Sequence, residues 1–386
     1  MNKKKIIRNL IFVLAILILM VILVVNLGDI KTIWRYLSKT NIWIVLLGAG
    51  ILILYALINQ LSLIFLIKFR FKEIKYFDAY CISGSEYFFN SITPFSSGGQ
   101  PFQAYALKRK GMSLSNSTSV LLINFIAYQI CLTFVSIIFM ILYYGRVKEQ
   151  ISSFIWFLIV GFSINTLIMV GLVLIGISKR SRQLFLKMFD LICKIKPLRR
   201  FQNRHDRFEQ SINNMQTAFK EMVKSWKLGL FVFFTKILSF MVYYSIPFVI
   251  LYSIGVKINI NDLPYVMALT SFSLTIATWV PTPGGAGGVE AAFTLLYSPL
   301  LISYGYEVEE AKNISIAIMV IWRLLTYYLL IFYGFVLYLL FEKRDGSISS
   351  KKEDVESKNS GLELSENNSN SSEANYVSKE DSLETN

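Results

Sequence analysis

The chain has 386 residues, a formal net charge of +14 and 54% hydrophobic residues. Its apolar residues come in blocks of about 20, the length that a helix needs to cross a bilayer, which indicates an integral membrane protein. The three cysteines have unrelated spacings, which argues against a disulfide framework or a metal site. The only histidine, His205, has no partner motif. No metal, cofactor or catalytic residue is therefore predicted.

Six segments are apolar and long enough to cross the membrane, at residues 7–27, 42–67, 117–144, 152–177, 228–255 and 313–341. The first segment is expected to be retained rather than cleaved as a signal peptide, because its apolar run is too long and no small-x-small cleavage site follows it. Two further apolar regions, at residues 76–107 and 263–304, are each interrupted near the middle by proline and glycine.

Lysine and arginine cluster before the first span, after the second and before the third. The loop 178–227 adds thirteen basic residues against four acids. The positive-inside rule places these segments and both chain ends in the cytoplasm. Residues 76–110 must then enter the membrane and return to the cytoplasmic face, and residues 263–304 must do the same from the opposite face. Both regions are predicted to be re-entrant helical hairpins.

The chain thus divides into two units, residues 7–144 and 152–341, each with the order span, span, hairpin, span. The units start on opposite sides of the membrane, so they form an inverted-topology repeat, which is the architecture of secondary transporters. The predicted fold is an all-α polytopic membrane protein with six spanning helices plus two re-entrant hairpins. This transmembrane domain covers residues 1–344, and residues 345–386 are predicted to be a disordered, acidic cytoplasmic tail.

Two related motifs interrupt the hairpins, `SITPFSSGGQPFQAY` at residues 91–105 and `VPTPGGAGGVEAAF` at residues 280–293. Both place Thr-Pro five residues before Gly-Gly. Proline and glycine favour a turn, and a helix that restarts after the turn points free N–H groups inward, which suits an anion such as phosphate. The alternative is structural, since small residues and proline kinks also serve close helix packing.

Polar residues around the two breaks are the predicted substrate-binding set. They are Glu86, Asn90, Thr93, Gly98, Gly99, Gln100 and Gln103 around the first, Thr282, Gly284, Gly285, Gly287, Gly288 and Glu290 around the second, and Arg323 in the last span. The residues predicted to break the helices are Pro94, Pro101, Pro281 and Pro283.

Arg323 lies about ten residues into the last span, where a charge is costly and therefore indicates function. Its guanidinium suits a phosphate, and the alternative is a structural pairing with Glu290, with Glu86 or with carbonyl groups of the hairpins. Lys236 is expected to reach the cytoplasmic surface by extending its side chain along its helix. Interhelical hydrogen bonds are expected from the amide side chains within the second and third spans, which are Asn59, Gln60, Asn124 and Gln129.

Within the basic loop, residues 182–201 have apolar side chains at helical spacing with cations between them. This pattern predicts an amphipathic helix on the anionic inner leaflet. Nucleic-acid binding is disfavoured. The positive charge of a cytoplasmic loop between two spans is already explained by the positive-inside rule and by attraction to anionic lipid.

The two motifs and `WRLLTYYLLIFYGF` at residues 322–335 resemble a flippase-like membrane family. This family includes the transmembrane part of the lysylphosphatidylglycerol synthases, or multiple peptide resistance factors. The resemblance covers residues 5–341. It implies a bacterial plasma-membrane protein that moves, or helps to process, a lipid with a phosphate and a cationic or sugar head group. The motif positions that it implies are Asn90, Gly98, Gly99, Gln100, Pro283, Gly284, Gly285, Gly287, Gly288, Glu290 and Arg323.

The first functional hypothesis is a flippase for aminoacylated phosphatidylglycerol or a related phospholipid or glycolipid. The alternative is a phosphatidylglycerol lysyltransferase component that contributes to resistance against cationic antimicrobial peptides. A third hypothesis is a scaffold for a partner aminoacyltransferase or glycosyltransferase, and a homo-oligomer is compatible with each. Residues 342–386 are too few and too polar for an aminoacyltransferase domain, so catalysis is not expected in this chain.

Overall fold

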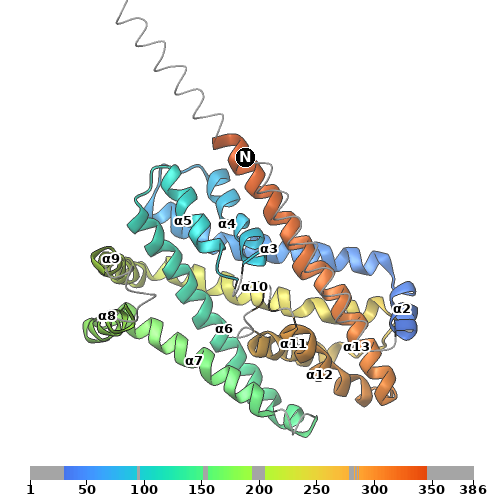
Figure 1. Ribbon diagram of the computed structural model, residues 1–386. Helices are drawn as coiled ribbons and strands as arrows, with labels where there is room; N and C mark the ends of the chain where they lie inside the picture. The colour runs from blue at the N-terminus through green and yellow to red at the C-terminus, as the bar shows by residue number, and fades with distance from the viewer. Residues whose placement is uncertain are drawn as a thin grey trace, which may run out of the picture. The chain divides into compact units, whose positions relative to one another are not determined.

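The structure is a computed structural model that describes residues 30–93, 96–150, 155–193, 205–277, 282, 285 and 287–345. Within these residues every regular element is helical (Figure 1). The predicted first span at 7–27 and the predicted tail after Asp345 lie outside the described residues.

Helices follow one another along the whole described chain. They are α2 (Ile30–Ser38), α3 (Ile42–Arg70), α4 (Tyr76–Ser91), α5 (Gly99–Arg109), α6 (Leu114–Gln150), α7 (Ile155–Ile177), α8 (Lys179–Cys193), α9 (His205–Lys224), α10 (Trp226–Ser253), the 3-10 turn η4 (Ile260–Asp262), α11 (Leu263–Ala277), α12 (Gly288–Ser303), α13 (Val308–Arg323) and the π-helical segment η6 (Leu324–Leu329).

Five helices in the described part are long and apolar enough to span a membrane, and they match the five predicted spans that fall there. Their bounds are Ile42–Arg70, Leu114–Glu149, Leu158–Ile177, Trp226–Ser253 and Val308–Asp345. Large apolar side chains such as Leu47, Leu167 and Phe234 point outward and are more than half exposed. Such surfaces suit lipid as the surrounding solvent, because hydrocarbon does not penalise exposed apolar groups.

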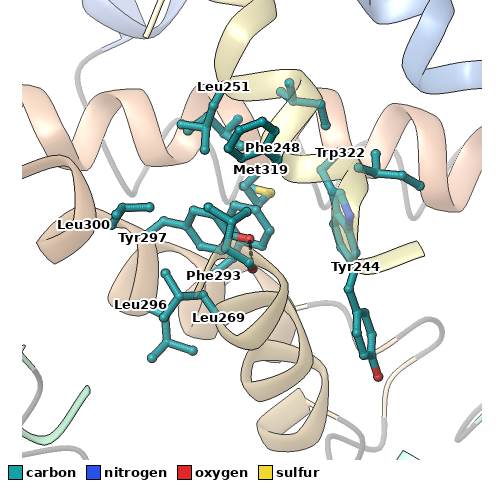
Figure 2. Packing of buried hydrophobic residues seen from close by; sticks show 14 of the residues in the cluster. Tyr244, Phe248, Leu251, Leu269, Phe293, Leu296, Tyr297, Leu300, Met319 and Trp322 are labelled. Atoms are coloured by element: carbon teal, nitrogen blue, oxygen red, sulfur yellow. Dashed lines mark hydrogen bonds between the residues drawn. The ribbon is translucent and has the colours of Figure 1, made fainter. Parts of the chain in front are cut away.

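The main core joins the C-terminal helices to α10 (Figure 2). The rings of Phe293 and Tyr297 on α12 stack with centroids 4.0 Å apart, and Phe293 also packs against Trp322 of α13. The buried Tyr297 hydroxyl forms a 2.7 Å hydrogen bond with Thr270 of α11, so its polar end is satisfied. This core fixes α12 between α11 and α13.

The interrupted region 76–107 forms a helical hairpin of α4 and α5. At its open end, Lys110 lies 3.8 Å from the carboxylate of Asp78. Midway, the Gln103 amide donates to the Ser83 carbonyl at 3.2 Å, and at the closed end the Gly99 N–H donates to Asn90. The two helices have 16 and 11 residues, so each is shorter than the roughly 20 residues of a spanning helix.

The region 263–304 forms the second hairpin, made of α11 and α12, with 15 and 16 residues. Its open end is held by the Tyr304 hydroxyl, which accepts from the Asn259 N–H at 2.9 Å and donates to the Asp262 carboxylate. Arg146, near the end of α6, forms a 2.9 Å ion pair with the same carboxylate. The described residues of the second motif, Gly285, Gly287 and the start of α12, therefore lie at the end of the hairpin opposite to Tyr304.

The basic loop contains two helices in its described residues. The first, α8, includes residues 182–193 of the amphipathic helix predicted for residues 182–201 and begins three residues earlier, and residues 194–204 lie outside the described residues. The second, α9, is mostly polar, but Ile212, Met215 and Phe219 follow one face of it and pack with Leu186 of α8 and Ile126 of α6.

Candidate functional site at the hairpin tips

The tip of the first hairpin holds a carboxylate among neutral amides. Asn90 donates to Glu86 Oε1 at 3.2 Å, and Gln103 of α5 donates to Glu86 Oε2 at 3.1 Å. Glu86 is half-buried, whereas Gln103 is fully buried. Three of the predicted binding residues thus lie in one cluster, and the Glu86 carboxylate is the charged group at its centre.

The N–H groups at the start of α5 already have partners within the chain. The Gly99 N–H donates to Asn90 Oδ1 at 2.8 Å, and the Gly98 N–H donates to Thr93 Oγ1 at 2.8 Å. A Cβ added to Gly99 would lie 2.6 Å from Glu86 Cγ, so this glycine is needed for close approach. An anion would thus have to displace side chains that cap this helix, which the motif alone did not indicate.

The second tip is built on backbone that only glycine adopts easily. Gly285 and Gly287 have φ angles of 65° and 90°, which lie in the left-handed region. The Gly287 N–H donates to Glu290 Oε2 at 2.6 Å, so Glu290 caps the first turn of α12. This glutamate therefore satisfies backbone at the start of its helix.

The other oxygen of Glu290 binds Arg323. Arg323 Nε donates to Glu290 Oε1 at 2.8 Å, and Arg323 Nη2 lies 3.5 Å from the Gly285 carbonyl oxygen. Both side chains are almost fully buried, at 7% and 3% exposure. The structural ion pair that the sequence left as an alternative thus exists, with Glu290 as the partner. Breaking a buried pair of this kind costs about 3–5 kcal/mol, so the pair strongly fixes the tip against α13.

The tip of the first hairpin contacts the π-helical continuation of α13, one turn after Arg323. The Tyr327 hydroxyl donates to the Ser91 carbonyl oxygen at 2.8 Å, at the end of α4. Tyr327 lies in the π-helical segment that follows Arg323, and such π-bulges occur often at functional sites. Arg323 also lies above the Tyr327 ring at 5.5 Å. Both motifs therefore converge on neighbouring turns of one helix.

Lys236 lies beside the first tip and does not reach the surface, contrary to the prediction. Its side chain is 2% exposed, and its ammonium donates to Asn59 Oδ1 at 2.8 Å. Asn59 donates in turn to the Tyr87 hydroxyl at 2.9 Å, and the charges of Lys236 and Glu86 interact. Lys236 is eleventh in α10, about 15 Å along the helix, which is too deep for its side chain to reach the end.

The interhelical hydrogen bonds predicted for Asn59, Gln60 and Asn124 are present, since Gln60 donates to Tyr333 and Ser62 donates to Asn124. Pro101 is the third residue of α5 and lies in its first turn, where proline is tolerated, so it does not interrupt this helix. Gln100, Thr282 and Gly288 are half-buried near the tips. Pro94, Pro281, Pro283 and Gly284 lie outside the described residues.

Sequence reasoning missed the contacts of Ser91, Tyr87 and Tyr327. Tyrosine and serine are common in apolar spans, so composition does not single them out. The one usable signal was the spacing of Tyr327, four residues after Arg323 and hence on the same face of the helix.

Comparison of the sequence with known proteins places it among membrane proteins of one family. The sequence signature described as "Lysylphosphatidylglycerol synthase TM region" matches residues 10–334. An "Uncharacterized protein MG306 homolog" of Mycoplasma pneumoniae is 24% identical over 353 residues, which cover 86% of this chain and 87% of the relative. A "UPF0104 membrane protein" of Archaeoglobus fulgidus is 24% identical over 336 residues, covering 82% of this chain and 94% of the relative. The chain therefore belongs to the family of the lysylphosphatidylglycerol synthase transmembrane region.

Proposed function

We propose that the protein is a multi-pass plasma-membrane lipid flippase that moves a polar head group past the two hairpin tips. The convergence of both tips on α13, through Arg323 and Tyr327, carries this proposal. A head group needs polar contacts at membrane depth, and irregular backbone is tolerated there only where it is buried in protein or lines a wet cavity. The acyl chains would stay in the surrounding lipid.

The proposed topology has six spans and two re-entrant hairpins in an inverted repeat. Five candidate spans, together with two hairpins whose helices are too short to cross, support this arrangement. In the repeat, α3 corresponds to α10 and α6 corresponds to α13, with one hairpin in each half. In inverted-repeat transporters the substrate site lies where the broken helices of the two halves meet.

Different parts of the site suit different parts of a lipid head group. Glu86 is half-buried and surrounded by neutral amide donors, so an ammonium or a hydroxyl group could bind its carboxylate. Glu290 is buried and uses both oxygens within the chain. We therefore assign the head-group contact to Glu86 and a positioning role to Glu290, which holds Arg323. A phosphate would approach the guanidinium of Arg323, whose Nε donates to Glu290.

A second candidate function is a membrane component that serves a lipid-modifying enzyme. The family description favours it, because that description refers to a synthase. The partner would be an aminoacyltransferase or glycosyltransferase that supplies or consumes the lipid. The phosphatidylglycerol lysyltransferase activity itself would then belong to the partner, with this chain as its membrane platform.

Reconstitution into liposomes tests the proposal. The full chain would be mixed with fluorescent phosphatidylglycerol, lysylphosphatidylglycerol or a glycolipid, and the fraction accessible to an impermeant quencher followed over time. We expect faster leaflet exchange for at least one lipid. Arg323→Lys and Tyr327→Phe should slow it, whereas Tyr105→Phe, which changes an exposed tyrosine on the first hairpin, should not. Exchange no faster than in protein-free liposomes for all three lipids would reject the flippase and favour the enzyme-partner function.

A further inference from the structure

The helix α8 has two apolar faces, and within the described part of the chain only one of them is covered. Leu186 is buried against Ile212, Met215 and Phe219 of α9. Four other large apolar side chains of α8 are exposed, namely Leu184 at 62%, Phe185 at 38%, Met188 at 51% and Leu191 at 65%. Leu184, Met188 and Leu191 follow one another at spacings of four and three, so they form a continuous stripe along the helix.

Exposed cations border this stripe. Arg180 and Lys187 are exposed and each lies four residues before a leucine of the stripe, Leu184 and Leu191. They belong to the loop 178–227, in which thirteen basic residues stand against four acids. The stripe and its basic edge match the surface of a phospholipid leaflet, which has an apolar interior and negatively charged head groups.

The chain connection places α8 where a membrane span ends. The candidate span α7 ends at Ile177 and α8 begins at Lys179, with Ser178 between them. In Figure 1, α7 runs across the view whereas α8 is seen nearly along its axis, so the chain turns sharply at this residue. A helix that leaves a span in this way lies at the level of the lipid head groups.

The other side of α8 rests on α9, which joins two spans. Asn214 donates to Ser115 at the start of α6, and Gln216 donates to the carbonyl oxygens of Ile175 and Ser178 at the end of α7. Arg182 of α8 donates to Asn213 of α9. The spans α6 and α7 belong to different halves of the chain, so α9 connects the halves at this end of the molecule.

We propose that α8 binds the anionic phospholipid surface of the leaflet at this end of α6 and α7, through its exposed apolar stripe and its basic edge. The bound helix then holds α9 against the two spans. The positive-inside rule assigns this leaflet to the cytoplasmic side. A second copy of the chain or a soluble protein would cover the stripe equally well, but neither would account for the basic edge beside the end of a span. This inference does not depend on lipid transport.

Depth-dependent quenching in nanodiscs tests the binding of lipid by the stripe. The full chain would carry Cys193→Ser, while Cys81 and Cys131 are buried and stay in place. A bimane probe would be attached at Met188→Cys, and at Gln183→Cys, a site on another face of α8, as the control. We expect brominated phosphatidylglycerol acyl chains to lower the Met188 signal about twofold or more while the Gln183 signal changes little.

Charge removal tests the anionic part of the proposal. Arg180→Gln with Lys187→Gln should reduce the quenching at Met188 to the level seen in phosphatidylcholine nanodiscs. Lys220→Gln with Lys224→Gln removes the same charge from α9 and should preserve the quenching. An equal loss in both double variants would overturn the assignment to α8. Equal quenching of both probe sites by aqueous iodide, or cross-linking of Met188→Cys between copies without lipid quenching, would overturn lipid as the occupant.

Discussion

Arg323 and Tyr327 lie four residues apart on α13 and its π-helical continuation, and each holds the tip of a different hairpin. Arg323 pairs with Glu290 at 2.8 Å, and Tyr327 donates to the Ser91 carbonyl oxygen at 2.8 Å. A shift of this helix by one turn would change both contacts together. The π-helical segment, whose hydrogen bonding differs from that of the flanking α-helix, directly follows Arg323 and contains Tyr327.

The buried ion pair predicts an asymmetric response to charge removal. Arg323→Gln leaves the Glu290 carboxylate at 3% exposure without its cation, so the free energy of unfolding should fall by about 3–5 kcal/mol. Arg323→Gln combined with Glu290→Gln should recover much of this loss, because two neutral amides can hydrogen-bond to each other. Equilibrium unfolding in detergent measures both. Glu290→Gln alone completes the cycle, and a loss in the double variant equal to the sum of the two single losses would mean that the pair contributes no coupling.

Arg323→Lys keeps the positive charge but loses the planar guanidinium group with its several N–H donors. We expect a folded protein with impaired lipid exchange, because an ammonium cannot contact Glu290 and a phosphate in the same bidentate manner. Liposome exchange and unfolding are measured on the same preparation. Unchanged exchange would remove Arg323 from the transport path and leave it a purely structural residue.

The hydrogen bond of Tyr327 can be removed with little change in shape. Tyr327→Phe leaves the ring in the cluster with Phe88 and Ile331 but deprives the Ser91 carbonyl oxygen of its donor. We expect a loss of about 0.5–1.5 kcal/mol in stability and a larger proportional loss of lipid exchange. The exposed Tyr105→Phe provides the control for hydroxyl loss as such. Equal exchange by both variants would show that the link to Ser91 does not matter for transport.

The spans and the hairpins could be predicted because they depend on coarse properties. Long apolar runs identified α3, α6, α7, α10 and α13, and Pro-Gly interruptions identified the closed ends of both hairpins. Most individual partners could not be predicted, because they depend on tertiary contacts, and the pairing of Arg323 with Glu290 was one of several alternatives.

Lys236 shows this limit most clearly. Lysine near a span end usually reaches the surface, but here Asn59 on a neighbouring helix binds the ammonium in the interior. The prediction of free N–H groups at Gly98 and Gly99 was wrong for a related reason. In the folded hairpin these groups donate to the side chains of Thr93 and Asn90.

The contacts of Asp262 with Arg146 and Tyr304 predict that the stability of the fold depends on pH. Burial favours a higher pKa for Asp262, but hydrogen bonds from Tyr304 and Arg146 and the Arg146 charge outweigh it and hold the pKa below its usual range. The group therefore stabilises the fold above about pH 4, and this contribution is lost as the pH falls through the lower, folded-state pKa. The difference in Tm between the wild type and Asp262→Asn should be largest near neutral pH and shrink toward about pH 3. The exposed Glu309→Gln serves as control. A difference that stays constant over this acidic range would exclude the linkage.

Removing the charge of Lys236 and removing that of Glu86 should lower the free energy of unfolding by different amounts, because the surroundings of the two side chains differ. Glu86→Gln removes a carboxylate whose charge favours the Lys236 cation and leaves that cation at 2% exposure with Asn59 as its acceptor, so the free energy of unfolding should fall. Lys236→Met should cost less, because the half-buried Glu86 keeps the amide donors of Asn90 and Gln103. The double variant should be more stable than Glu86→Gln alone, since no charge remains unpaired. Unfolding free energies of the three proteins give the order directly. If Lys236→Met proved the more damaging single change, the ammonium would have a structural role that its hydrogen bond with Asn59 and the charge of Glu86 do not explain.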